Sequence, residues 1–220
     1  MPADGKALTD TLRVSVKLAR MTREPMFTPH PPPEPTTPEK GGVDNAKRLF
    51  DTLYPEPVRG DGDGWVLSDN GAAYWGKHGA AGLLLRAPGP DGSLAVLLQH
   101  RAAWSHQGGT WGLPGGARDS HETPEQAAVR EAHEEAGLPA ELVTVRTTVV
   151  TATAAGSRWT YTTVIADAAG LLETVPNRES SELRWVAEDE VADLPLHPGF
   201  AASWERLREV AATIPLQAGL

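Results

Sequence analysis

The chain has 220 residues, a formal net charge of −9 and no cysteine. This length suits one full-sized domain with an appendage, so we expect a single hydrophobic core. The excess of 29 Asp and Glu over 20 Lys and Arg argues against binding to a nucleic-acid polymer, which needs clustered cations. The absence of cysteine excludes disulfides, thiolate metal ligands and cysteine nucleophiles. No apolar run approaches a membrane span, and we expect a cytoplasmic protein with no membrane partner.

The beginning of the chain differs in composition from the rest. Residues 25–38 hold seven prolines in fourteen positions, which is typical of extended, flexible segments. A short helix is predicted over residues 43–54, before Pro55. The sequence therefore predicts three parts: a proline-rich, flexible N-terminal extension (1–58), a folded domain (59–213) and a C-terminal tail (214–220).

From about residue 60 onward, short apolar runs alternate with turn residues. Runs rich in Val, Leu, Thr and aromatic side chains predict strands over residues 65–67, 80–86, 94–100, 142–153, 159–166 and 183–186. The turn residues 88–92 predict a hairpin between the second and third of these strands. Helices are predicted over residues 124–136, 188–192 and 200–212. The predicted architecture is a mixed sheet with helices on its faces.

The helix over residues 124–136 is specified by its own two ends. Thr123 is an N-cap, Gln126 completes a capping box with it, and Pro124 suits the first helical position. Gly137 stands where a left-handed C-cap is required. These local signals predict both boundaries of the helix.

Glu131, Glu134 and Glu135 stand at positions i, i+3 and i+4 of this helix, so their carboxylates share one face. Like charges at this spacing repel one another, and no lysine follows at i+4 to pair with them. One interpretation is a solvated acidic surface, which is the usual role of a charge run. The other is a site for a hard divalent cation, for which carboxylate oxygens are suitable ligands. We favour the metal site because the repulsion needs a compensating cation.

The same stretch resembles the Nudix box, G-x5-E-x7-R-E-U-x-E-E-x-G-U, in which U is a bulky aliphatic residue. The positions that match are Gly116, Glu122, Arg130, Glu131, Glu134, Glu135, Gly137 and Leu138. The one departure is Ala132, which is smaller than the usual aliphatic residue and affects only packing beneath the helix. A long pattern with fixed spacing is far more specific than a short motif. The resemblance implies a Nudix α/β/α sandwich, a mixed sheet between helices.

The resemblance also implies a metal site and a reaction. The implied ligands of Mg²⁺, or of Mn²⁺, are three carboxylates and a backbone carbonyl: Glu131, Glu134, Glu135 and Gly116 or its neighbour Gly115. Arg130 and Glu122 would form an ion pair that supports the catalytic helix, which ends at Gly137. The metal would neutralise the phosphates and activate water, and Glu134 or Glu135 would accept the proton.

Residues outside the box bear on the substrate. The window 153–156 lacks the proline typical of ADP-ribose hydrolases and the tyrosine typical of diadenosine polyphosphate hydrolases. Residues 99–101, 108–116 and 121–127 look like the MutT-type branch, which includes mycobacterial-type homologues acting on 8-oxo-dGTP. This resemblance implies cleavage of a nucleoside triphosphate to its monophosphate and pyrophosphate, with oxidised purine nucleotides as substrates. Such a reaction removes damaged precursors before they enter DNA.

Several further residues receive roles from the same resemblance. Arg101 would contact phosphate, and Glu182 would be an additional metal ligand, with Glu179 as the competing candidate. His197 and Phe200 lie in the loop where this branch places residues that contact the base. Among the seven tryptophans, the expected pocket rim comprises Trp104 and Trp159, and the expected core members are Trp65, Trp75, Trp111, Trp185 and Trp204.

Two other functions compete with this prediction. The chain could hydrolyse ADP-ribose, nucleotide sugars or other capped nucleotides. It could also be a nucleotide-sensing domain that binds without turnover, although a sensor has no need of the full carboxylate set. In each case the expected partner is a small-molecule nucleotide. The oligomeric state stays open, with a homodimer as one option.

Overall fold

The computed structural model describes residues 60–216, so the predictions for the N-terminal extension, including the helix over 43–54, lie outside the described residues. Its core is a seven-stranded sheet in the order β5-β4-β3-β8-β7, with β6 paired to β3 and β9 paired to β4. The strands are β3 (Ala80–Pro88), β4 (Leu94–Arg101), β5 (Trp111–Gly112), β6 (Gly115–Ala117), β7 (Thr144–Thr153), β8 (Thr160–Asp167) and β9 (Ser180–Ala187). A 3₁₀ turn, η1 (Ala140–Leu142), precedes β7.

The pairing confirms the predicted mixed sheet. Strand β3 lies parallel to β8 and antiparallel to β4 and β6. The predicted hairpin joins β3 to β4, with Pro88 opposite Leu94, and β7 pairs antiparallel with β8. Because β3 is covered on both faces, its sequence is apolar without alternation from Ala80 to Leu85, and Arg86, which follows, is buried in an ion pair with Asp167.

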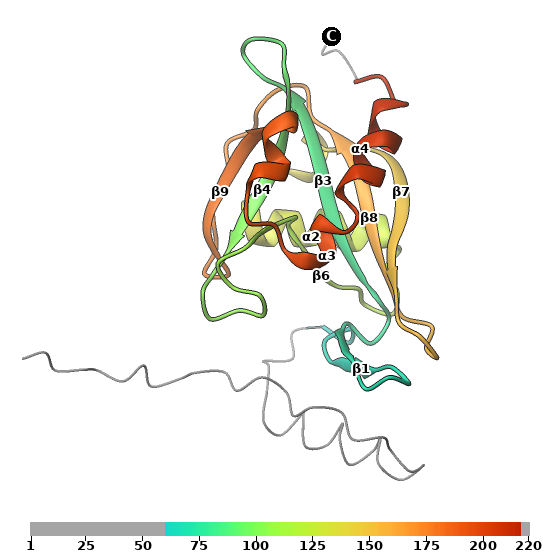
Figure 1. Cartoon of the computed structure of the whole chain (residues 1–220). Helices are drawn as coiled ribbons and strands as arrows, with labels where there is room; N and C mark the ends of the chain where they lie inside the picture. Colours follow the sequence, from blue (N-terminus) through green and yellow to red (C-terminus); the bar gives the residue numbers. More distant parts are fainter. Residues whose placement is uncertain (1–59, 217–220) are drawn as a thin grey trace, which may run out of the picture. The chain divides into compact units, whose positions relative to one another are not determined.

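Helices cover both faces of this sheet, as Figure 1 shows. Helix α2 (Pro124–Ala136) packs on one face, and α3 (Pro198–Ala201) and α4 (Trp204–Ala212) lie on the other. The side of α2 that faces the sheet consists of small buried residues: Ala127, Ala128, Ala132 and Ala136. Alanines let the helix approach β3 closely, so Ala132 is accommodated in a shallow interface. The sandwich implied by the Nudix box is confirmed.

The last part of the chain corrects two helix predictions. Residues 188–192 form a 3₁₀ helix, η2 (Glu188–Asp193), and the helix predicted over 200–212 is divided into α3 and α4. The division lies at Ser203, whose hydroxyl donates to the carbonyls of Gly199 and Phe200 at 3.1 Å each. A serine that bonds to preceding carbonyls in this way competes with the regular helical pattern.

A separate two-stranded hairpin precedes the main sheet. It consists of β1 (Trp65–Leu67), which the sequence predicts, and β2 (Ala73–Trp75), which it does not. Trp65 pairs with Trp75 across the hairpin, and their rings meet edge to face at 5.0 Å. Within residues 60–216, no helix has both the length and the apolar character needed to cross a membrane.

Candidate active site

Helix α2 has the ends that the sequence predicts. The side chain of Thr123 accepts a hydrogen bond from the Gln126 amide, and the Gln126 side chain accepts one from the Thr123 amide, which completes the capping box. Gly137 has φ 68°, the left-handed conformation of a C-cap. Both ends of the helix are therefore anchored locally, and this fixes the direction in which its glutamates point.

Glu131, Glu134 and Glu135 of α2 line one cleft of about 950 Å³. The side chain of Glu134 is 44% exposed, whereas that of Glu131 is 15% exposed. Glu135 is buried, and its Oε2 accepts a hydrogen bond of 2.8 Å from the Gly115 amide. The sequence prediction that these carboxylates share a face is confirmed, and the structure adds that they differ strongly in access to solvent.

Two glycines allow the β6 backbone to lie against these carboxylates. A Cβ atom on Gly116 would stand 2.6 Å from Cδ of Glu131, and a Cβ on Gly115 would stand 2.4 Å from the carbonyl oxygen of Ala81. A side chain at Gly116 would therefore displace the Glu131 carboxylate. The β6 backbone therefore lies directly against the Glu131 and Glu135 carboxylates.

Arg130 connects the box loop to the helix. Its guanidinium binds Glu122 through two bonds, Nε to Oε1 at 2.6 Å and Nη2 to Oε2 at 2.9 Å. Its Nη1 lies 2.8 Å from Glu131 Oε1 and 3.6 Å from Glu134 Oε1. The predicted Arg130–Glu122 pair is present. The structure adds that Arg130 also approaches two of the glutamates from within the same helix.

The electrostatics of the cleft disfavour charged carboxylates in the absence of a cation. Burial raises the pKa of Glu131 to about 7, against the opposing influence of Arg130. Burial, with the nearby charge of Glu131, raises the pKa of Glu135 to about 8. Glu122 shows the opposite behaviour, since its hydrogen bonds from Arg130 lower its pKa. Neighbouring carboxylates of this kind fit a divalent metal ion, whose charge would favour their ionised form.

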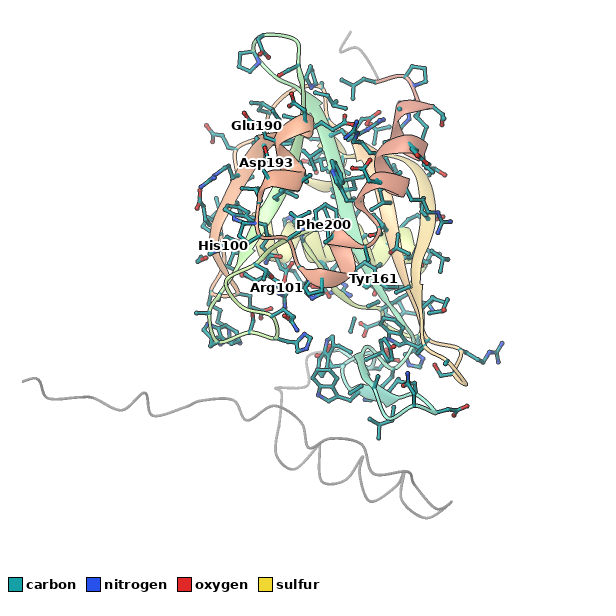
Figure 2. All side chains as sticks on the ribbon, in the orientation of Figure 1. His100, Arg101, Tyr161, Glu190, Asp193 and Phe200 are labelled. Carbon is teal, nitrogen blue, oxygen red and sulfur yellow. The ribbon has the colours of Figure 1, made fainter. Side chains whose placement is uncertain are left out.

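A basic and aromatic group occupies another part of the cleft. Arg101, His106, His197 and Phe200 all line it, and Figure 2 shows Arg101 at the end of its strand with Phe200 nearby on α3. Burial, with the charge of Arg101, lowers the pKa of His197 to about 4, so this imidazole is neutral at physiological pH. Its Nδ1 accepts the Gly199 amide at 3.1 Å. The structure therefore brings the three predicted substrate residues to the same cleft as the glutamates.

Comparison with known proteins identifies the family. The sequence pattern described as NUDIX domain matches residues 76–207, more than half of the chain. The chain belongs to the NUDIX family. It is 77% identical over 166 residues to a Mycobacterium tuberculosis protein named "Putative 8-oxo-dGTP diphosphatase 3", covering 74% of this chain and 76% of that one.

Two further relatives agree with this assignment. The crystal structure of a Nudix hydrolase from M. smegmatis, RenU, is 79% identical in sequence and has a TM-score of 0.70. It covers 72% of this chain and 100% of its own. A Bifidobacterium longum fusion of a nucleoside triphosphate pyrophosphatase with a Nudix hydrolase is 40% identical over 156 residues, 69% of this chain and 32% of that one.

The two acids considered as an additional metal ligand, Glu182 and Glu179, differ in their position relative to the cleft. Glu182 does not line the cleft, and its side chain, 45% exposed, binds Arg184 at 2.6 Å. Glu179 does line the cleft, and its charge contributes to the raised pKa of Glu135. Both residues lie near the start of β9, where the pairing with β4 shifts register between His100 and Arg101. This irregularity of the strand pairing is not visible in the sequence.

The cleft also contains residues that lie before the matched NUDIX segment. Trp65 and Trp75 were expected in the core, but they are half-buried and line the cleft together with Trp159 and the exposed Trp104. The prediction for Trp104 and Trp159 as pocket residues agrees with the geometry. For Trp65 and Trp75 the only sequence signal was their position beside short apolar runs. Such a position does not distinguish a residue that lines a cleft from one that lies in the core.

The loop at residues 60–64, which precedes this hairpin, is hydrogen-bonded to the loop of the Nudix box. The Gly62 amide donates to Asp119 Oδ1 at 2.8 Å, and the Ser120 amide donates to Asp61 Oδ1 at 2.8 Å. Gly62 also accepts the Lys77 amide at 2.7 Å. Potential ligand atoms of Asp61, Asp119 and His121 lie within 4.8 Å of one another. The loop that carries Glu122 is therefore held from a segment outside the family match.

We expect the requirement for Mg²⁺ to depend on pH. A proton and a cation compete for Glu131 and Glu135, whose pKa values are raised to about 7 and 8 without metal. The Mg²⁺ concentration giving half-maximal activity should therefore fall as pH rises from 6 to 9. The metal-free protein should lose stability as pH rises from about 4.5, the ordinary value for Glu, to about 8, because in this window the folded state binds more protons than the unfolded state. Thermal melts with EDTA or Mg²⁺ at each pH test this, and a pH-independent Mg²⁺ requirement would contradict it.

Proposed function

We propose that this chain is a Mg²⁺-dependent pyrophosphohydrolase that converts 8-oxo-dGTP, or a similar oxidised purine nucleoside triphosphate, to its monophosphate and pyrophosphate. The observation that carries the proposal is the convergence of Glu131, Glu134 and Glu135 on one cleft that Arg101 also lines. Membership of the NUDIX family makes the reaction a hydrolysis of a phosphoric anhydride bond. The choice of nucleotide is supported by the mycobacterial relative whose name contains 8-oxo-dGTP.

The charges in the cleft suit this reaction. A triphosphate has several negative charges, and Mg²⁺ bound by the α2 carboxylates would neutralise them and polarise the attacked phosphorus. Glu135 and Glu131 are fixed by Gly115 and Arg130, whereas Glu134 is the carboxylate most open to solvent. We assign the acceptance of the water proton to Glu134 and the holding of metal mainly to the other two. Glu179, in place of Glu182, is our candidate for an additional ligand.

The remaining residues of the cleft bind and orient the nucleotide. Arg101 donates Nε to the His106 carbonyl at 3.0 Å, which orients the guanidinium for contact with phosphate. His197 is neutral at physiological pH and accepts at Nδ1, so its proton lies on Nε2 as a hydrogen-bond donor. Phe200 is held edge to face against Trp204 at 5.5 Å and offers an apolar ring at the cleft. We propose that His197 and Phe200 contact the base or sugar.

A substrate panel tests the function directly. We expect purified protein with Mg²⁺ to hydrolyse 8-oxo-dGTP with a higher kcat/KM than dGTP, ADP-ribose or diadenosine polyphosphates. Chromatography should detect the monophosphate and pyrophosphate, not the diphosphate and phosphate. Higher efficiency with ADP-ribose would contradict the substrate, and no turnover of any compound would contradict the enzymatic function. The cytoplasmic location and the oligomeric state stay predictions, and mass measurement in solution would determine the latter.

A further inference from the structure

Tyr161 lies in the cleft but has no part in the reaction described above. It stands at the start of β8, next to the central strand β3, opposite Ala80 in the parallel register. Its side chain lines the same cleft as Glu131 and Glu135. Figure 2 shows Tyr161 near Phe200, on the far side of that residue from Arg101. The ring therefore lines the same cleft as both the α2 carboxylates and the residues assigned to nucleotide binding.

The hydroxyl of Tyr161 occupies a space that exists because residue 82 is glycine. A Cβ atom on Gly82 would stand 2.1 Å from the Tyr161 hydroxyl oxygen and 3.1 Å from Cζ of the ring. Gly82 pairs with Gly115 across β3 and β6, and the Gly115 amide binds Glu135. The hydroxyl therefore lies beside Gly82, and the strand partner of Gly82 is Gly115, whose amide positions the buried Glu135 carboxylate.

This hydroxyl has no hydrogen-bond partner among residues 60–216. Its neighbours Thr151 and Thr163 instead bond to each other at 3.1 Å between their hydroxyls. Phenol hydroxyls in protein interiors normally have a partner, so an unpaired one that faces a cleft is suited to a ligand. Burial, with the charges of Glu135 and Glu131 and against that of Arg101, raises the pKa of Tyr161 to about 12. The group is therefore a neutral donor at physiological pH, able to bind an anionic oxygen.

We propose that the Tyr161 hydroxyl donates a hydrogen bond to a phosphate oxygen of the substrate, at the end of the phosphate chain nearest Glu135. The assignment rests on the proposed function for the identity of the substrate, but not for the phosphate contact itself. It gives Gly82 a defined role as the residue that makes room for this donor. A donor placed at a group that carries developing charge contributes to the rate as well as to binding.

The first test removes only the hydroxyl. We expect Tyr161→Phe to lower kcat/KM for 8-oxo-dGTP about 10- to 100-fold, the usual effect of losing a hydrogen bond to a charged group. With Mg²⁺ present, calorimetry should show weaker binding of inorganic pyrophosphate to the variant, while binding of the uncharged nucleoside 8-oxo-deoxyguanosine stays unchanged. The thermal midpoint should also stay near that of the wild type, because the deleted atom has no partner in the protein.

These measurements separate a failure of the inference from a failure of the proposed function. If 8-oxo-dGTP is not hydrolysed, the comparison of pyrophosphate binding still decides whether Tyr161 contacts phosphate. Equal pyrophosphate binding by variant and wild type, or no binding by either, would overturn the phosphate contact. A loss of nucleoside binding as large as the loss of pyrophosphate binding would also overturn it and place the hydroxyl at the base.

A double-mutant cycle provides the second test. Gly82→Ala places a methyl group where the hydroxyl stands, so it should displace the ring and reduce pyrophosphate binding at least as much as Tyr161→Phe. In the Tyr161→Phe background the added methyl no longer meets an oxygen, although it still lies 3.1 Å from the Cζ position, so the further loss caused by Gly82→Ala should be clearly smaller than in the wild-type background. Additive losses would show that Gly82 acts independently of the hydroxyl and would contradict the inference.

Discussion

Replacement of Glu135 by glutamine should reduce kcat for 8-oxo-dGTP by at least about 100-fold in saturating Mg²⁺, because a neutral amide is a poor ligand for a hard cation. The substitution preserves the shape of the side chain, and the amide oxygen can still accept the Gly115 amide that Glu135 binds at 2.8 Å. The fold should therefore survive. Metal titration followed by steady-state kinetics measures the effect, and near wild-type activity would show that Glu135 has no metal or proton-transfer role.

The same variant should be at least as stable as the wild type when metal is absent. Burial raises the pKa of Glu135 to about 8, so ionising it above that pH opposes folding, and glutamine removes this penalty. A gain in thermal midpoint at pH 9 in EDTA, together with the loss of activity, would identify Glu135 as a group retained for function. The matched control is Glu125→Gln, the same change on the same helix but outside the cleft, which should alter neither property.

Replacement of Arg130 by methionine should impair both stability and catalysis. The guanidinium satisfies both oxygens of Glu122, which is only 9% exposed, and it lies 2.8 Å from Glu131. Without it a buried carboxylate loses its partner, and we expect a loss of about 1–3 kcal/mol, moderated because Arg130 is partly exposed. Activity should fall about tenfold or more, because the box loop and Glu131 lose their common anchor. Urea unfolding and kinetics measure the two effects.

Two companion variants show whether the charge or the geometry of Arg130 matters. Arg130→Lys keeps the charge but cannot bind Glu122 through two parallel bonds, so it should be intermediate. Adding Glu122→Gln to Arg130→Met removes the unpaired charge and should recover part of the lost stability without recovering activity. Unchanged stability in Arg130→Met would contradict the structural role of the pair.

The parts of the structure that follow from local chemistry could be predicted from the sequence. Helix α2 begins after Thr123 and ends before Gly137 because both signals act within a few residues. The strand β3 was predicted from its apolar run alone. The short strands β2 and β6 could not be, because a run of three residues, two of them glycine in β6, has no clear strand pattern of its own and depends on its pairing partner, β1 for β2 and β3 for β6.

The candidate site shows the same division. The face shared by Glu131 and Glu135 follows from helical spacing, and the structure confirms it. The choice of Glu179 over Glu182 depends on the register of β9 against β4, which is a tertiary property. The proposed role of Tyr161 could not be predicted from the sequence for a related reason. The space for its hydroxyl is provided by Gly82, which is distant in the sequence and lies beside Tyr161 only because β3 pairs with β8.

The loop at residues 60–64 and the hairpin after it form a part of the cleft in which the sequence can change without affecting the Nudix box. Its backbone is bonded to Asp119 and Ser120 of the Nudix box, and the hairpin after it provides Trp65 and Trp75 to the cleft. A domain boundary drawn at residue 76, where the family match begins, would pass through the binding cleft. Substitutions in this upstream stretch can reshape the cleft while Glu131, Glu134 and Glu135 are all retained. Relatives with identical boxes can therefore differ in the nucleotide that they prefer.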